Sequence, residues 1–291
     1  MGLQDSLNDG KFAVIAEIDP PKGCETAGLF EKTDPIKGRV DALLVTDMPS
    51  AVMKLGSLSV SYLLKERGFD TIFNLTCRDR NVLALQSDLL NASALGIENI
   101  YITRGDEISL GDHPRVCVVN EVNEVEMLSI VRGLEEGKDW AGNKLESSPK
   151  FNTGSYLNLN MKGEELENEM REVGEKHQQG ASFFITPAVF DPESFGESIE
   201  KIRKVIDVPI IAEIILLKSV ATARFLNKHV DHITVSDSII DRMYSAGDKL
   251  AESMSITADI IKGLRGLCEG IKIVPLGWEE KLPSFFDAAG L

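Results

Sequence analysis

Two carboxylates at the end of an apolar run are the first candidates for chemistry. The stretch "AEIDPP" (16–21) places Glu17 and Asp19 two residues apart, so an extended strand would point both to one face. In a purely structural interpretation, Glu17 forms an ion pair and Asp19 caps the following loop. In a catalytic one, Glu17 donates a proton, because burial and a like charge nearby raise a carboxyl pKa. Glu17 is the better acid, since Asp19 precedes Pro20 and already leaves the strand.

The turn "TRGD" (103–106) follows another apolar run. It is either an ordinary surface turn or an anion contact made by Arg104 and the backbone of Gly105, with Asp106 facing a site. The turn "CRDRN" (77–81) contains two arginines and also has two interpretations. Its arginines either lie in solvent or bind a phosphate at a helix N-terminus.

Other familiar signatures are missing from the sequence. There is no G-x-G-x-x-G after the first apolar run, no Walker-type loop and no G-x-S-x-G elbow. The four histidines lack metal-ligand spacing and the four cysteines form no C-x-x-C pair, so we expect no metal site and reduced, cytoplasmic thiols.

The charge balance narrows the range of partners. Lysine and arginine number 31 and aspartate and glutamate 46, a net charge of −15 over 291 residues. We therefore expect neither nucleic acid nor a membrane surface as a partner. An apolar content of 43% is enough for a substantial core, and no apolar segment is long enough for a membrane helix.

Short apolar runs alternate with amphipathic stretches, which predicts parallel strands with helical crossovers. The runs lie at 12–18, 41–46, 71–77, 99–105, 150–158, 182–190, 209–216, 232–236 and 271–277. Polar residues follow most of them, as a (β/α)8 TIM barrel requires at its catalytic end: Glu17, Thr46, Thr76, Asp106, Thr186 and Glu213. Nine runs are one too many for that barrel, and periodicity leaves 232–236 and 271–277 as the two candidates for removal.

The segments between the runs carry helix punctuation. Helices are predicted over 50–68, 79–96, 163–180 and 191–206, with Ser50 and Asp79 as N-caps and glycines 68, 96 and 180 after the last turns. We expect one domain over 1–291. An insertion at about 106–150 holds a helix near 121–135 between long polar loops, which are typical of a site cover or a partner surface.

Several segments taken in order resemble the flavin-dependent methylenetetrahydrofolate reductase family, in its short bacterial form without a regulatory domain. They are "AEIDPPKG", "LLVTD", "NLTCRDRN", "GIENIYITRGD", "GASFFITPAVFDPESF" and "IVPLGWEEKLP", and the likeness runs from about residue 11 to the end. It implies a (β/α)8 barrel with 271–277 as the eighth strand. It also implies a flavin, taken as FAD with FMN as the alternative, in contact with Thr46, Asn74, Arg104, Gly105, Asp106, Asn158 and Lys176.

The resemblance also implies a reaction, the reduction of 5,10-methylenetetrahydrofolate to 5-methyltetrahydrofolate in cytoplasmic one-carbon metabolism. In this oxidoreductase acting on CH–NH donors, Glu17 would protonate the leaving nitrogen and the flavin would supply hydride. Asp106 would stabilise the cationic intermediate.

Four positions depart from the family pattern. Pro187 follows Thr186 where a glutamine is usual, Glu213 replaces a glycine, Trp278 stands where some members have arginine, and Asn74 replaces a histidine. We expect Thr186, Glu213 and Trp278 to contact the folate. Because the residues expected to contact a nicotinamide are altered, the sequence does not decide whether NADH is the direct electron donor. It favours a partner subunit that donates electrons within an oligomer. The alternatives are a flavin-binding electron-relay or non-catalytic subunit of a methyl-transfer complex, and a barrel acting on another pterin or corrinoid methyl donor.

Overall fold

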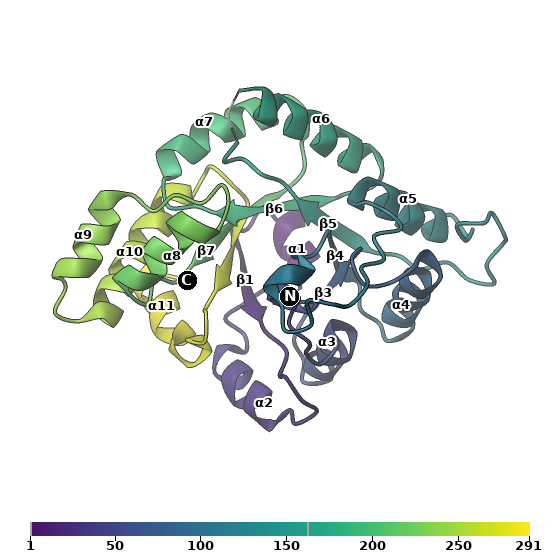
Figure 1. Cartoon of the computed structure of the whole chain (residues 1–291), viewed down its shortest axis with the longest axis horizontal. Helices are drawn as coiled ribbons and strands as arrows, with labels where there is room; N and C mark the ends of the chain where they lie inside the picture. The colour runs from purple at the N-terminus through teal and green to yellow at the C-terminus, as the bar shows by residue number, and fades with distance from the viewer. Residues whose placement is uncertain (1, 162) are drawn as a thin grey trace.

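Eight parallel strands close into a barrel in the computed structural model, which describes residues 2–161 and 163–291. Each strand pairs with the next in the chain, and β8 returns to pair with β1 (Figure 1). The predicted (β/α)8 barrel is confirmed. Its strands are β1 (Ala13–Ile18), β2 (Ala42–Val45), β3 (Thr71–Thr76), β4 (Asn99–Thr103), β5 (Asn152–Tyr156), β6 (Phe183–Ala188), β7 (Ile210–Ile215) and β8 (Gly270–Val274).

Helices surround the strands on the outside of the barrel, except α1, which lies across one end (Figure 1). They are α1 (Leu3–Asn8), α2 (Ala27–Thr33), α3 (Ser57–Glu66), α4 (Val82–Ala94), α5 (Glu124–Glu135), α6 (Glu164–Gln178), α7 (Pro192–Ile202), α8 (Val220–His229), α9 (Asp237–Ser245), α10 (Lys249–Leu264) and α11 (Leu282–Ala289). Short 3-10 turns η1 to η4 lie at Asp34–Ile36, Pro49–Ala51, Ile108–Leu110 and Glu279–Lys281. None of the described helices has the length and apolar character needed to cross a bilayer.

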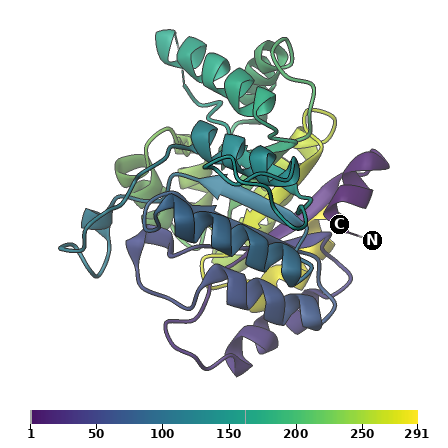
Figure 2. The same ribbon diagram turned by 90° about the vertical axis from the view of Figure 1, so that its right-hand side faces the viewer.

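The alternation of side chains along each strand divides the core in two. One set faces outward and packs against the helices; the other fills the barrel with Ala13, Ile15, Ala42, Leu44, Ile72, Tyr101, Phe183, Ile185 and Ile211. Leu3 of α1 joins this inner set, and its backbone N–H donates to Asp70 Oδ2 at 2.8 Å. Helix α1 therefore closes one end of the barrel, and Figure 2 shows it on the side opposite the segment around η3.

The ninth apolar run is not a strand. Residues 232–236 form a loop that leads into α9, and 271–277 supplies β8, as the family likeness implied. Asn227 explains the loop, because its side chain donates to the carbonyl of Val235 at 2.9 Å and accepts from its N–H at 2.7 Å. The backbone groups of Val235 that a strand ladder would use are therefore already satisfied.

The three glycines predicted after the last helical turns are confirmed, whereas the two predicted N-caps, Ser50 and Asp79, are wrong. Glycines 68, 96 and 180 all have positive φ just beyond α3, α4 and α6. Ser50 lies in η2, six residues before Gly56, the true N-cap of α3. Asn81, not Asp79, caps α4 by accepting from Ala84 N–H at 3.0 Å, because Asp79 is paired with Arg78.

The segment 106–150 contains one helix, α5, as its pattern predicts. A reciprocal capping box begins that helix: Asn123 accepts from Glu126 N–H at 2.9 Å, and Glu126 accepts from Asn123 N–H at 2.8 Å. The stretch before it holds only η3 among regular elements and projects at the carboxyl ends of the strands (Figure 2). It therefore lies at the end of the barrel where chemistry is expected.

Packing of the barrel interior gives a stability prediction. A Cβ added at Gly154 would lie 2.2 Å from the ring of Phe183, which is fully buried. We expect Gly154→Ala to lower the free energy of unfolding by about 1–3 kcal/mol through overpacking. Gly247→Ala is the matched control, because its Cβ would meet no atom within 4 Å. Urea unfolding of both variants checks this, and equal stabilities would contradict the interior packing described here.

Candidate functional site

A cavity of about 520 Å³ opens at the carboxyl ends of the strands. Eight of the residues predicted from sequence line it: Glu17, Thr46, Asn74, Arg104, Gly105, Asp106, Lys176 and Glu213. They come from six different parts of the barrel, at or after β1, β2, β3, β4 and β7 and on α6, and meet only because the sheet closes. The lining also includes Asp47, Tyr101, Tyr156 and Lys272, which the sequence interpretation did not select.

At one wall of the cavity, Lys272 lies between two carboxylates. Its Nζ is 2.6 Å from Glu17 Oε2 and 2.6 Å from Glu213 Oε2. The three residues stand on β1, β7 and β8, which are neighbours in the closed barrel. The Lys272 side chain is 7% exposed, and those of Glu17 and Glu213 are 19% and 17% exposed. The cluster is therefore partly desolvated and carries two anions for one cation.

Burial dominates the electrostatics of Glu17. Desolvation raises the pKa of its carboxyl group most strongly, the Lys272 cation opposes this, and the anions of Glu213 and Asp19 add to the rise. The net pKa is raised. For Lys272, the two carboxylates outweigh the effect of burial, so its pKa is also raised and it stays a cation. Glu17 thus has the ion pair of the structural interpretation and the raised pKa of the catalytic one.

Asp19 itself points away from this cluster. Its carboxylate accepts from Thr46 Oγ1 at 3.2 Å and pairs with Lys54. Thr46 also donates to the carbonyl of Ile18, at 3.4 Å. The arrangement ties the end of β1 to the end of β2 and leaves Glu17 as the strand's contribution to the cavity.

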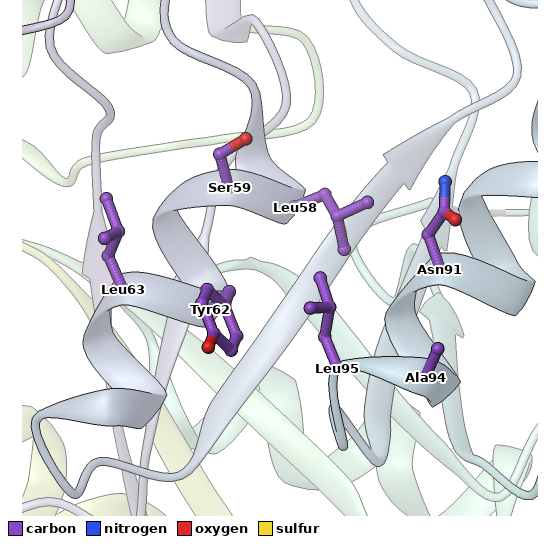
Figure 3. A pocket seen from close by; sticks show the side chains of 7 residues that line it. All are labelled: Leu58, Ser59, Tyr62, Leu63, Asn91, Ala94 and Leu95. Carbon is purple, nitrogen blue, oxygen red and sulfur yellow. The ribbon is translucent and has the colours of Figure 1, made fainter.

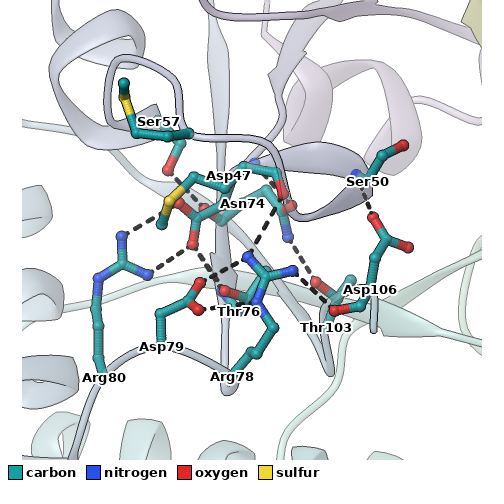
Figure 4. Close-up of polar contacts among 12 residues, drawn as sticks. Asp47, Ser50, Ser57, Asn74, Thr76, Arg78, Asp79, Arg80, Thr103 and Asp106 are labelled. Carbon is teal, nitrogen blue, oxygen red and sulfur yellow. Dashed lines mark hydrogen bonds and ion pairs between the residues drawn. The ribbon is translucent and has the colours of Figure 1, made fainter. Parts of the chain in front are cut away.

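A second polar network braces the neighbouring rim (Figure 4). Asp47, whose side chain is fully buried, accepts from Thr76 N–H at 3.1 Å, Thr76 Oγ1 at 3.0 Å and Arg80 at 2.7 and 3.1 Å. Its own N–H donates to Asn74 Oδ1 at 3.2 Å. The amide of Asn74 then donates to Tyr101 O at 2.9 Å and Thr103 Oγ1 at 3.0 Å. Asn74 is therefore held by three neighbours and presented in one orientation.

The two arginines of "CRDRN" belong to this polar network or lie beside it. Arg80 pairs with Asp47 and also with Asp88 at 3.0 Å. Arg78 pairs with Asp79 at 2.6 Å and donates to the carbonyl of Asp106 at 2.9 Å (Figure 4). Both guanidinium groups are thus committed to contacts within the chain.

The "TRGD" turn lies at the cavity mouth. Gly105 has a φ of +89°, and an added Cβ would approach the Cβ atoms of Arg78 and Thr76 to 3.1 and 3.2 Å. The turn therefore requires glycine. Asp106 accepts from Ser50 N–H at 2.6 Å across the mouth. Among the described residues, Arg104 makes no hydrogen bond or ion pair, so its exposed guanidinium is available to an anion.

Lys176 is a second buried cation, on the opposite side of the cavity. Its side chain is 1% exposed, and its Nζ lies 2.9 Å from Glu172 and 3.3 Å from Glu124. It also donates to the carbonyl of Tyr156 at 3.2 Å. Burial lowers its pKa, but the surrounding carboxylates raise it more, so the ammonium group stays charged.

Three predicted site residues lie outside the cavity lining. Asn158 is buried, with its N–H donating to Glu169 at 2.7 Å and its Oδ1 accepting from Asn160 N–H at 3.0 Å. Thr186 is buried at the irregular end of β6 and donates to the carbonyl of Pro187 at 3.0 Å. Trp278 packs beside Phe285, with ring centroids 6.0 Å apart. The structure does not bring these three together with Glu17.

Lys272 is the functional candidate that sequence reasoning missed. It lies in "GIKIV", where isoleucines flank a lysine inside an otherwise apolar strand. A charged side chain is almost never buried without a partner. The alternation of this run could have identified an inward-facing cation, whereas its partner Glu213 follows only from the register of β7 and β8 in the structure.

A separate apolar groove lies between α3 and α4, on the outside of the barrel (Figure 3). Its volume is about 450 Å³, and its lining consists of Leu58, Ser59, Tyr62, Leu63, Asn91, Ala94 and Leu95. It contains no acidic or basic side chain. The groove shares no lining residue with the cavity at the barrel mouth and is not part of the candidate site.

A family comparison agrees with this geometry. The family described as methylenetetrahydrofolate reductase matches residues 2–276, nearly the whole chain. The chain belongs to the methylenetetrahydrofolate reductase family. Among proteins of curated function, none matches it by sequence. Membership in the reductase family thus rests on the family match, and the cavity lies at the end of the barrel where active sites of TIM barrels are found.

Solved structures share the fold of this reductase-family chain. A protein from Clostridium thermocellum, described as binding two copies of 5-methyl-5,6,7,8-tetrahydrofolic acid, has a TM-score of 0.69 and 17% identity. The match covers 99% of this chain and 98% of that one. EDTA monooxygenase from Chelativorans sp. BNC1 matches with a TM-score of 0.57 and 10% identity, over 96% of this chain and 93% of that one. At such identities, the likeness shows the fold.

The rim network of this reductase-family chain gives a second stability prediction. Asp47→Ala removes a buried carboxylate that serves Thr76 and Arg80, so we expect a loss of about 3–5 kcal/mol in unfolding free energy. Asp88→Ala is the control, because it removes the more exposed partner of Arg80 and should cost about 1 kcal/mol or less. Denaturant titrations measure both, and similar losses would mean that Asp47 does not brace the rim.

Proposed function

We propose that this chain is a flavin-dependent enzyme that reduces 5,10-methylenetetrahydrofolate to 5-methyltetrahydrofolate, with Glu17 as the proton donor. The observation that carries the proposal is the position of Glu17, whose carboxyl group at the end of β1 faces the cavity from a partly desolvated wall; burial there raises its pKa. Membership in the methylenetetrahydrofolate reductase family supports the reaction class. The folate bound by the structural neighbour supports a folate substrate.

The chemistry needs an acid that is protonated near neutral pH. A methylene carbon that bridges two nitrogens accepts hydride only after one C–N bond opens, and protonation of the leaving nitrogen opens it. Burial of Glu17 favours the neutral carboxyl, which can hold that proton. Asp106, the last residue of the "TRGD" turn, lines the cavity and, as an anion, would stabilise the cationic carbon that results.

The cavity lining fits a flavin. Arg104 has a guanidinium without an ion pair among the described residues, which suits a phosphate. The backbone at Gly105 has no side chain to obstruct a flat ring, and Thr46 and Asn74 offer polar groups on the adjoining strands. Bound there, FAD or FMN would supply the hydride. On the opposite wall, the ammonium group of Lys176 is already paired with two carboxylates, so its contribution to flavin binding would be through hydrogen bonding and not through net charge.

The source of electrons is part of the proposal. Pro187 removes the side-chain amide usual after Thr186, and Thr186 directs its hydroxyl to a backbone carbonyl instead of the cavity. A nicotinamide would find fewer contacts on this face. We propose that a partner subunit, and not NADH, delivers electrons to the flavin in a cytoplasmic oligomer. The segment 106–150 at the mouth is the surface we assign to that partner.

Replacement of Glu17 tests the proton donor. We expect Glu17→Gln to lower turnover of methylenetetrahydrofolate by about 10²–10⁴-fold, because the amide cannot give up a proton. Its oxygen can still accept from Lys272, so the fold and ligand binding should persist. The measurement is anaerobic oxidation of the reduced flavin, followed by absorbance after addition of methylenetetrahydrofolate. NADH is tested separately as reductant.

Glu280→Gln is the matched control, since that carboxylate is 71% exposed and outside the cavity. It should turn over at the rate of the unmodified protein. If Glu17→Gln also kept that rate, Glu17 would not be the acid. If no variant oxidised the flavin with methylenetetrahydrofolate, the proposed reaction itself would be wrong.

The raised pKa of Glu17 predicts a pH dependence. Because the protonated form is the active one, kcat/KM should fall as pH rises through the raised pKa, which lies above the usual value of 4.5. The profile is measured with flavin reduced in advance, so that electron delivery does not limit the rate. A profile that instead rises through this range would require ionised Glu17 and would contradict its role as an acid.

A further inference from the structure

The cluster of Glu17, Lys272 and Glu213 has a property beyond an isolated acid. Both carboxylates contact the same ammonium nitrogen at 2.6 Å, so the two contacting oxygens are at most about 5 Å apart. The barrel fixes this arrangement, because β8 pairs with β7 on one side and β1 on the other. In the register of β7 and β8, Glu213 lies directly beside Lys272.

The charges in this cluster do not balance. With both carboxylates ionised, the cluster has a net charge of −1 in a partly desolvated wall. One added proton makes it neutral, whereas a second would leave Lys272 as an uncompensated cation. A buried charge is costly unless it is paired. The cluster is therefore built to hold one proton.

The surrounding groups do not supply a different counter-charge. Asp19, the acid that directly follows β1, is engaged by Lys54 and Thr46. Tyr101 and Tyr156, which face the cavity from β4 and β5, have raised pKa values because they are buried near carboxylates, so they remain neutral. The proton that neutralises the cluster thus resides on Glu17 or Glu213.

We propose that Lys272 is a positioning residue that holds Glu17 and Glu213 as a carboxyl pair sharing one proton, so that Glu213 controls the protonation of Glu17. The destination of that proton rests on the proposed function. In the reaction, the O–H bond of Glu17 breaks as an N–H bond forms on the folate. Two carboxylates are left on one ammonium until water at the cavity mouth returns a proton to the pair.

A pair that shares a proton titrates as a unit. Replacing one member by its amide removes the anionic neighbour, so the remaining carboxyl group should lose its proton at lower pH. We expect Glu213→Gln to shift the titration of Glu17 downward by about 1 pH unit or more. Linkage requires that Glu17→Gln shift Glu213 by the same amount.

The test is a ¹³C NMR titration of glutamate side-chain carboxyl groups in the flavin-free protein, with signals assigned by comparison of the two variants. Glu280→Gln serves as control and should shift neither signal. Lys272→Met should move the shared titration the other way, to higher pH. Should that variant fail to fold, the two amide variants still decide the question. Independent titration of Glu17 and Glu213, each unaffected by loss of the other, would overturn the proposal.

Turnover separates this inference from the proposed function. With active enzyme, Glu213→Gln should move the alkaline fall of kcat/KM to lower pH by the amount measured by NMR, whereas a merely structural role would lower the rate at every pH. Coupled titration without any folate turnover would defeat the proposed function and leave the shared proton standing. Folate turnover with independent titration of Glu17 and Glu213 would overturn the shared proton and leave the proposed function standing.

Discussion

The contact of one buried ammonium with two carboxylates is the interaction on which the candidate site depends. Lys272 keeps Glu17 and Glu213 at a fixed separation and prevents the repulsion that would otherwise drive them apart. At Glu17, desolvation raises the pKa of the carboxyl group more than the Lys272 cation lowers it, so the pKa is raised. The cluster combines structural rigidity with an exchangeable proton, which a lone carboxylate at the barrel mouth would not provide.

The rest of the site is organised so that this cluster faces an otherwise well-braced cavity. Asp47 and Asn74 connect the ends of β2, β3 and β4 through hydrogen bonds, and Arg80 neutralises the buried carboxylate at their centre. Preorganised polar groups of this kind need little rearrangement when a ligand binds. The exposed Arg104 is the exception, and its freedom suits a group that arrives with its own negative charge.

Two family departures gain a physical reading from this arrangement. Glu213, at a position where the family resemblance leads us to expect glycine, is with Glu17 a partner of the buried Lys272, so the three residues form one feature. Thr186 and Pro187 are turned toward each other at the irregular end of β6, away from the cavity. The wall that carries Glu17 therefore has more charged side chains, while the wall near Thr186, where a nicotinamide would be expected, offers fewer polar groups to a ligand.

The sequence by itself determined the class of fold, and most of the site residues predicted from it do line the cavity. Alternating apolar and amphipathic segments specify parallel strands with helical crossovers, and polar residues after the strands identify the catalytic end. The choice between 232–236 and 271–277 needed the family resemblance, because Asn227 satisfies the loop backbone from a distance along the chain. Tertiary structure alone decided which charges meet. Glu17 and Lys272 are 255 positions apart, and only barrel closure makes β1 and β8 neighbours. Local periodicity reports which face of a strand is buried, but the identity of a partner across the barrel depends on closure and register.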